Sequence, residues 1–250
     1  MRRLLELFGR KAAPAPRARF EAPLAPDEPL AVIGDVHGRD DLLGRLLDRL
    51  AEEAPGHRVV LVGDLMDRGE RSAQVVRRLI ARDDLVVLRG NHEVMCLDFL
   101  EEPERKGPLW IRNGGLQTLA SFGVGGLGIS PSPAALREAA GRLETAMGTE
   151  MMAWLRLRPL TFHSGNVAVV HAAADPDLAI EEQEEATLLW GHPRFLRDAR
   201  ADGVWVVHGH TILEEPVAEA GRIGVDTGAY ATGRLTAALI RPGGVSFVSA

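Results

Sequence analysis

Five short segments of the chain carry residues that could bind metal ions or transfer protons. They are GDVHG at 34–38, GDLMDRG at 63–69, RGNHE at 89–93, VHA at 170–172 and HGHT at 208–211. Each follows a run rich in β-branched residues, which is typical of a buried central strand. Because polar groups at the carboxyl ends of such strands converge on one crevice, these distant segments are expected to meet in space.

The candidate metal ligands are two aspartates, one asparagine and three histidines: Asp35, His37, Asp64, Asn91, His171 and His210. One residue separates Asp35 from His37, so both side chains can reach one ion from a tight turn bounded by glycines. Carboxylate, amide and imidazole donors without a thiolate suit two divalent ions rather than a structural zinc. The segments therefore predict a site for two metal ions.

Strands and helices alternate in the first half of the chain, and strands dominate the second half. Strands are expected at 30–34, 58–63 and 85–89, with helices at 40–53, 71–82 and 92–100. Short crossovers of this type imply parallel strands with helices on their faces. Residues 108–158 contain no clear strand and look helical on both sides of a Gly/Pro/Ser loop at 123–133. Further strands are expected at 160–163, 166–170, 204–208, 216–219, 222–225, 235–240 and 245–249, with a helix at 181–190.

Composition indicates one ordinary globular domain. We expect it to span 28–250, with a helical insertion at about 107–158 that could roof the site. Residues 1–27, rich in Ala, Pro and Arg, indicate a disordered tail or linker, with a short amphipathic docking helix as the alternative. The net charge of −6 gives no electrostatic footprint for nucleic acid. No apolar run approaches the roughly 18 residues of a membrane span, so no membrane partner is expected.

Cys96 is the single cysteine of the chain. It follows GNHE in an apolar stretch, and we expect a buried structural thiol there. A lone cysteine forms no intrachain disulfide, and this fits a cytoplasmic protein.

The five motifs resemble, in order and spacing, those of the calcineurin-like metallophosphoesterases. The resemblance runs from about Leu30 to the C-terminus and is strongest to the bacterial phosphoprotein phosphatase branch, which is serine/threonine protein phosphatase-like. It implies an α/β fold in which two mixed β-sheets pack face to face with helices outside, a four-layer α/β/β/α sandwich. It also implies two divalent metal ions, Mn²⁺ in the first place with Fe or Zn as alternatives. Asp64 would bridge the ions, and a bridging hydroxide would be the nucleophile.

The same resemblance assigns roles to residues that bind no metal. His92 follows the ligand Asn91 and would be the general acid that protonates the leaving oxygen. Asp67 would hold His92 and favour its charged form. Arg68 matches the family's phosphate-binding arginine, and Arg89 flanks the same loops as a second candidate or as a supporting residue.

One later loop departs from the family pattern. The family usually has Trp-x-Arg there, with an arginine that also clamps phosphate, whereas this chain has Trp190-Gly191-His192-Pro193-Arg194. Arg194 could take that role from a displaced position, His192 could replace it, or the loop could have diverged with the substrate.

Three functions compete on these residues. A serine/threonine or dual-specificity protein phosphatase, acting on a phosphorylated protein or peptide or on a small phosphoester, fits GDLMDRG and GNHE. A diadenosine polyphosphate hydrolase would typically show GDxxARGP and GNHD, although Trp110 and Trp190 could supply a stacking surface for a base. A non-enzymatic phosphate-binding module would be expected to have lost a ligand or the acid, and none is lost. The oligomeric state is left open by the sequence.

Overall fold

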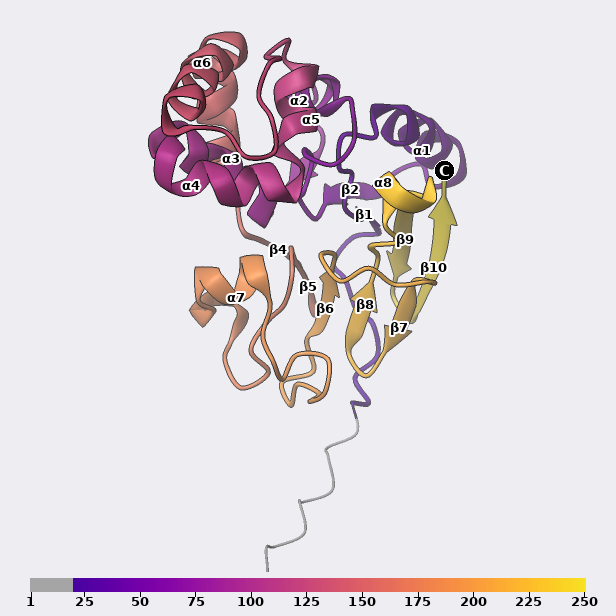
Figure 1. Ribbon diagram of the computed structural model, residues 1–250. Helices are drawn as coiled ribbons and strands as arrows, with labels where there is room; N and C mark the ends of the chain where they lie inside the picture. Colours follow the sequence, from indigo (N-terminus) through magenta and orange to yellow (C-terminus); the bar gives the residue numbers. More distant parts are fainter. Residues whose placement is uncertain (1–19) are drawn as a thin grey trace, which may run out of the picture.

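Two five-stranded mixed sheets form the centre of the protein (Figure 1), which is known here from a computed structural model that describes residues 20–250. The first sheet has the order β10-β9-β1-β2-β3, with β1 (Leu30–Ile33), β2 (Arg58–Leu61), β3 (Val86–Val87), β9 (Thr236–Arg241) and β10 (Gly244–Ser249). The second has the order β4-β5-β6-β8-β7, with β4 (Thr161–Ser164), β5 (Val167–Val170), β6 (Trp205–His208), β7 (Val217–Glu219) and β8 (Arg222–Gly224).

The strand directions explain why the motifs meet. β1, β2 and β3 run parallel, and so do β5, β6 and β8, whereas β4, β7, β9 and β10 are antiparallel additions at the edges or flanks. The five motifs follow β1, β2, β3, β5 and β6, so all of them leave the carboxyl ends of parallel strands. The predicted double-sheet fold is confirmed.

Helices cover the outer faces and build the region before the second sheet. α1 (Asp40–Glu53), α2 (Ser72–Ile80) and α3 (Asn91–Glu101) follow the first three strands. The segment predicted to lack strands, 108–158, begins within α4 (Pro103–Trp110). It continues through the π-helical turn η1 (Ile111–Gly115), α5 (Leu116–Ser121) and α6 (Pro133–Arg156). The short 3₁₀ turn η2 (Ile180–Glu182), α7 (Glu185–Trp190) and α8 (Ala229–Thr232) complete the set. No helix within residues 20–250 has the length and apolar character needed to cross a membrane.

Alternation along β1 shows how the layers pack. Ala31 and Ile33 lie in a core shared with α1 and α2, whereas Leu30 and Val32 lie in a second core between the sheets. A strand buried on both faces needs apolar residues at every position, and all four are fully buried.

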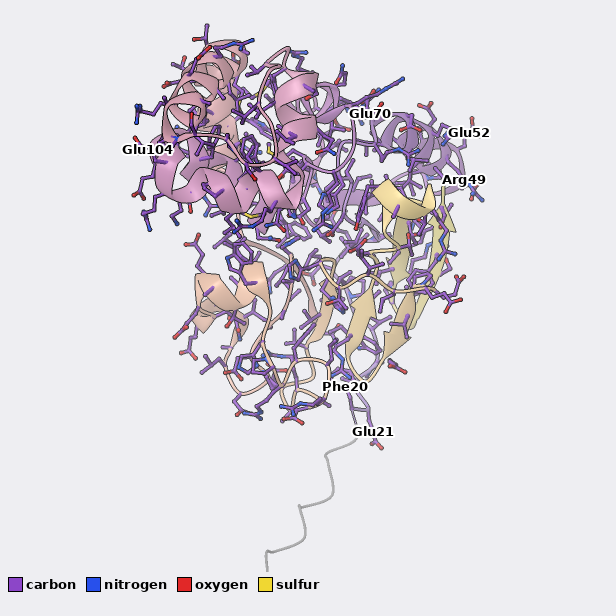
Figure 2. The ribbon with its side chains drawn as sticks, viewed as in Figure 1. Phe20, Glu21, Arg49, Glu52, Glu70 and Glu104 are labelled. Atoms are coloured by element: carbon purple, nitrogen blue, oxygen red, sulfur yellow. The ribbon has the colours of Figure 1, made fainter. Side chains whose placement is uncertain are left out.

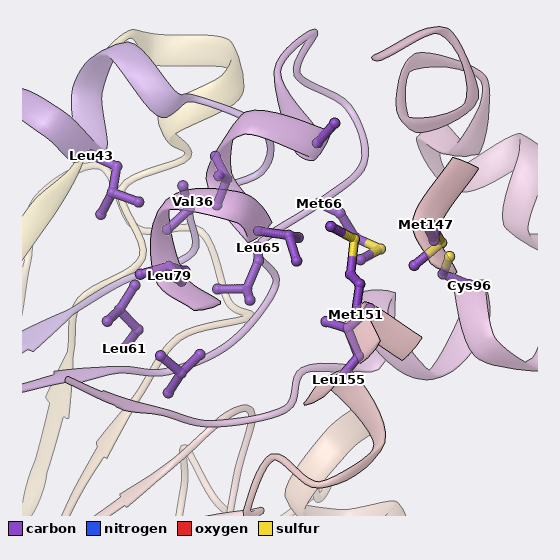
Figure 3. Packing of buried hydrophobic residues seen from close by; sticks show 14 of the residues in the cluster. Val36, Leu43, Leu61, Leu65, Met66, Leu79, Cys96, Met147, Met151 and Leu155 are labelled. Carbon is purple, nitrogen blue, oxygen red and sulfur yellow. The ribbon is translucent and has the colours of Figure 1, made fainter. Parts of the chain in front are cut away.

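The helix-side core continues into the insertion. Figure 3 shows Met66, which follows β2, close to Met151 and Leu155 of α6, with Met147 beside Cys96 of α3. Cys96 is completely buried, and burial raises the pKa of its thiol well above the usual value, as expected for a structural cysteine. The helical insertion is therefore packed against the segment that carries the second motif.

Residues 20–27 correct the predicted boundary of the domain. The Phe20 ring packs edge-on against Trp205 with 5.1 Å between centroids, and Leu24 is buried. Ala25 N donates to Asn166 Oδ1 at 2.7 Å. Figure 2 shows Phe20 at the end of the second sheet. Composition indicated a linker because it cannot reveal hydrogen-bond partners supplied from distant loops; the predicted docking helix lies outside the described residues.

Candidate active site

The backbone of the motif loops adopts an unusual conformation. Five residues of the predicted site have left-handed φ angles between 45° and 68°, a region that costs most non-glycine residues energy. Among residues 20–250, Ala220 is the one other non-glycine residue with a positive φ. The five are His37, Asp64, Asp67, Arg68 and His210. Strain of this kind persists where surrounding contacts hold the backbone in place. Here it is concentrated at the candidate metal ligands and catalytic residues.

The first and second motif loops are bonded directly to each other. The amides of Val36 and His37 both donate to Asp64 O, at 3.1 and 2.8 Å, and Gly38 N donates to Leu65 O at 2.9 Å. These bonds hold the two loops together at the carboxyl ends of β1 and β2.

The first group of ligands is centred on His37. Its Nδ1–H donates to Met66 O at 2.8 Å, which leaves the Nε2 lone pair for an ion. That Nε2 lies 3.5 Å from Asp64 Oδ2 and 4.0 Å from Asp35 Oδ2. Burial lowers the pKa of His37 to about 3, so the ring is neutral, as a metal ligand must be.

The second group joins the two sheets. His171 donates from Nδ1 to Val62 O at 3.1 Å, and its Nε2 lies 2.8 Å from Asn91 Oδ1 and 3.4 Å from Asp64 Oδ1. His210 Nδ1 lies 3.1 Å from the same Asn91 oxygen. Because Nδ1 of His171 carries the proton, its Nε2 lone pair faces the lone pairs of Asn91 Oδ1. A shared cation would stabilise this arrangement, so the donor set fits a divalent ion.

Asp64 faces both groups of candidate ligands, each with a different carboxylate oxygen. Oδ2 faces His37, and Oδ1 faces His171. A carboxylate can bind one cation with each oxygen, so this geometry suits a bridging ligand. Asp35 also contacts both groups, because its Oδ2 lies 4.0 Å from His37 Nε2 and His210 N donates to its carboxylate at 3.1 Å. Burial and the nearby Asp226 carboxyl raise the pKa of Asp35, an effect that a bound cation would oppose.

His92 forms a buried dyad with Asp67. Its Nδ1–H donates to Asp67 Oδ2 at 2.8 Å, and its Nε2 lies 3.8 Å from Asp64 Oδ2. Burial alone would lower the pKa of His92, but the carboxylates of Asp64 and Asp67 outweigh burial and raise it. On distance alone, Nε2 could also join His37 and Asp64 around one ion. The bond to Asp67 orients the ring as a proton donor requires, and the acid role remains the prediction.

Asp67 is held by the insertion. Trp110 Nε1–H lies 2.9 and 3.1 Å from its two oxygens, and Thr118 Oγ1–H donates to Oδ1 at 2.6 Å. Trp110 is fully buried and stacked on Phe99 at 4.6 Å. It therefore offers no surface to a base, which corrects the expectation that it could stack on substrate.

Glu93 has a role that the motif comparison missed. Its Oε2 accepts from Asp64 N at 2.9 Å and Gly90 N at 2.8 Å, and its Oε1 accepts from Leu65 N at 2.8 Å. Burial raises its pKa to about 7. Its position at the third residue of α3 was the available clue, because an acid there commonly reaches back to the first amides of a helix.

The three candidate phosphate arginines have different surroundings. Arg68 faces the ligands and donates to His37 Nε2 and His92 Nε2, both at 3.1 Å. Arg89 points instead to Arg156 O and Glu185 Oε1, each at 3.2 Å.

Arg194 pairs with Asp177 and Asp198, at 2.5 and 2.8 Å. The structure therefore brings one of the three arginines, Arg68, to the ligands.

The loop after α7 forms a cavity beside His210. The cavity has a volume of about 420 Å³, and its lining includes Trp190, His192 and Leu196. Trp190 is 47% exposed, and Nδ1 of His192 is buried without a hydrogen-bond partner in residues 20–250. Of the two residues considered for the missing arginine's role, His192 lines the cavity beside His210 and Arg194 does not.

Two further residues beside the candidate site were not predicted from the sequence. Asp226 is buried next to Asp35, and burial raises its pKa to about 6. Tyr230 of α8 contacts both Arg68 and His37. Both belong to one turn after β8, a segment in which no motif was recognised.

The comparisons with known proteins agree with the fold. A model of the calcineurin-like phosphoesterase family matches residues 28–214, and the chain belongs to this family. It is 30% identical to serine/threonine-protein phosphatase 1 of Salmonella typhimurium, over 84% of this chain and 91% of that relative. It is 29% identical to a symmetrical bis(5'-nucleosyl)-tetraphosphatase of Pseudomonas fluorescens, over 61% of this chain and 45% of that relative.

Among solved structures, a putative diadenosine tetraphosphatase has the same fold, with a TM-score of 0.63 at 21% identity over 92% of this chain and 98% of that one. The chain is accordingly a hydrolase of phosphoesters. Its family implies divalent metal ions, and the histidine and aspartate cluster is suited to hold them.

Proposed function

We propose that the protein is a dinuclear-metal-dependent phosphomonoesterase that acts on phosphoserine or phosphothreonine in proteins or peptides, with phosphotyrosine as a further substrate. The observation that carries this proposal is the buried hydrogen bond from His92 to Asp67, at 2.8 Å. A chain with alanine in place of Asp67 would lack this dyad. Trp110 and Thr118, both from the helical insertion, donate hydrogen bonds to the Asp67 carboxylate and hold it in place.

The ligands divide into two overlapping sets. Asp35, His37 and Asp64 would hold one ion, and Asp64 with Asn91, His171 and His210 would hold the other. When bound, two divalent ions, Mn²⁺ as first choice, supply an activated water and neutralise charge on the phosphoryl oxygens.

The chain's own groups handle the substrate and the proton. Arg68 presents two guanidinium nitrogens beside His37 and His92, and this fork can bind two oxygens of a phosphoryl group. His92, oriented by Asp67, would give its Nε2 proton to the departing oxygen. Its neighbours raise its pKa, which increases the fraction of the acid form.

A diadenosine polyphosphate hydrolase is the second candidate, because one observation favours it. Trp190 is half-exposed at the cavity beside His210 and could stack on a base. Against it, the complete Asp67–His92 dyad matches the protein phosphatase motif.

The test compares kcat/KM, with Mn²⁺ added, for phosphoserine, phosphothreonine and phosphotyrosine peptides and for diadenosine tetraphosphate. We expect at least one phosphopeptide to exceed the dinucleotide. The Asp64→Asn variant, purified in parallel, measures contaminating phosphatase. A dinucleotide value well above that of every peptide would reverse the assignment.

A further inference from the structure

Tyr230, the one tyrosine of the chain, faces the phosphate-binding candidate Arg68. The Arg68 guanidinium carbon lies 4.9 Å from the centre of the Tyr230 ring. The same ring meets the His37 imidazole edge to face, with 5.4 Å between centroids. A guanidinium within about 6 Å of an aromatic centroid is attracted to the negative face of the ring.

The ring is placed by a turn with its own fixed geometry. Gly228 is left-handed at the start of α8, and its amide donates to Asp226 Oδ1 at 2.8 Å. Arg39 Nη1–H donates to Ala229 O at 2.9 Å and ties α8 to the beginning of α1. Tyr230 therefore comes directly after an anchored turn rather than from a free loop.

Arg68 is held at its main chain but has competing side-chain partners. Its amide donates to Gly114 O at 3.3 Å, and a Cβ on Gly114 would collide with Arg68. Its guanidinium donates to Nε2 of both His37 and His92. The Nε2 lone pair of His37 cannot serve a guanidinium and a cation together, so an ion bound there would displace this contact.

We propose that Tyr230 is a positioning residue that keeps the Arg68 guanidinium aimed at the phosphoryl group through its ring face. The ring face needs no lone pair from a metal ligand, so this contact is compatible with ions bound at His37. The inference rests on the proposed phosphate-binding role of Arg68. It assigns the turn after β8 a part in substrate binding that the five motifs do not include.

The experiment uses four variants of the full chain: Tyr230→Phe, Tyr230→Leu, Arg68→Ala and the Tyr230→Leu/Arg68→Ala double variant. Phe keeps the ring face, and Leu keeps bulk without it. Orthophosphate binding by calorimetry with Mn²⁺ present, and KM and kcat for p-nitrophenyl phosphate, are the readouts. Metal content and melting temperature are measured on each variant as controls.

We expect Tyr230→Phe to bind orthophosphate within roughly twofold of the parent protein. Tyr230→Leu should weaken binding and raise KM by about 3- to 30-fold, the range of a cation–π contact, with a smaller change in kcat. In the Arg68→Ala background, Tyr230→Leu should have no further effect.

An equal loss in the Phe and Leu variants, or an additive loss in the double variant, would overturn the proposal. Absence of phosphoester hydrolysis in the parent protein would instead refute the proposed function. Orthophosphate binding would in that case still report on the contact between Tyr230 and Arg68.

Discussion

The two sheets contribute to the site in different ways. On the first sheet, Glu93 accepts three main-chain hydrogen bonds from the loops after β2 and β3, and Asp67 is held by Trp110 and Thr118. On the second sheet, the His171 side chain donates one hydrogen bond, to Val62 O, and the neighbouring Trp190 is half-exposed. The candidate acid and its partner thus lie on the braced side, the first sheet, whereas the open side, the second sheet, supplies two candidate metal ligands beside a cavity that could vary with the substrate.

The largest effect should come from the residue that both sides share. Asp64→Asn removes the charge between the two ligand groups, so we expect both ions to be weakened and activity to be abolished. Chelation of the parent protein should have the same effect, and Mn²⁺ should restore activity. Metal content per chain is the measurement. Full activity in metal-free protein, or one ion per chain at saturation, would contradict the dinuclear site.

The next effect isolates the dyad of the braced side. His92→Asn should lower kcat by about 10²–10⁴-fold, the usual contribution of a positioned proton donor, and leave metal content unchanged. The loss should be smaller for substrates with acidic leaving groups, which need less protonation. Loss of metal in this variant would show that His92 is a ligand.

Trp110→Phe tests whether bracing from the insertion matters for catalysis. The substitution keeps the stack on Phe99 but removes the indole N–H from Asp67, and we expect kcat to fall by about 10-fold, as for loss of one hydrogen bond to a charged group. Phe99→Leu is the matched control, because it weakens the stack and leaves the N–H in place. It should lower the melting temperature clearly and change kcat little. A large fall in kcat in Phe99→Leu would show instead that Trp110 acts through packing alone.

The smallest effect belongs to the open side. Trp190→Ala should change the ratio of kcat/KM between substrates with flat and with aliphatic leaving groups by about 2- to 10-fold, the range of aromatic contacts. Its effect on p-nitrophenyl phosphate kcat should be slight. Arg194→Ala, which removes a guanidinium already paired with Asp177 and Asp198, should leave KM unchanged. An increase in KM for every substrate in Arg194→Ala would restore its predicted phosphate role.

The features that could be predicted from the sequence depend on residues close to one another in the chain. Asp35 and His37, like Asn91 and His92, are near neighbours in the chain, so a strand end and a tight turn determine where their side chains lie. The expected helix at 40–53 coincides with α1 for a similar reason, because its apolar period is regular.

The remainder depends on tertiary contacts. The bond from Trp110 to Asp67 spans 43 positions, and no local pattern distinguishes it from an indole that faces substrate. α8 has four residues between two left-handed glycines, too few to show a period, so Tyr230 was not expected at the site. Arg194 sits in a loop where two aspartates compete for its charge, and motif spacing does not reveal such competitors.

The left-handed backbone at the site also places function and folding stability in opposition. Each left-handed non-glycine residue costs roughly 1–2 kcal/mol, and glycine at the same position would relieve most of it. At Asp67 this backbone gain is offset, because glycine would remove the buried acceptor for Trp110 and His92. Ala220, left-handed in the turn between β7 and β8, is the position where the same exchange carries no such penalty. Stabilising this enzyme without loss of activity should begin there.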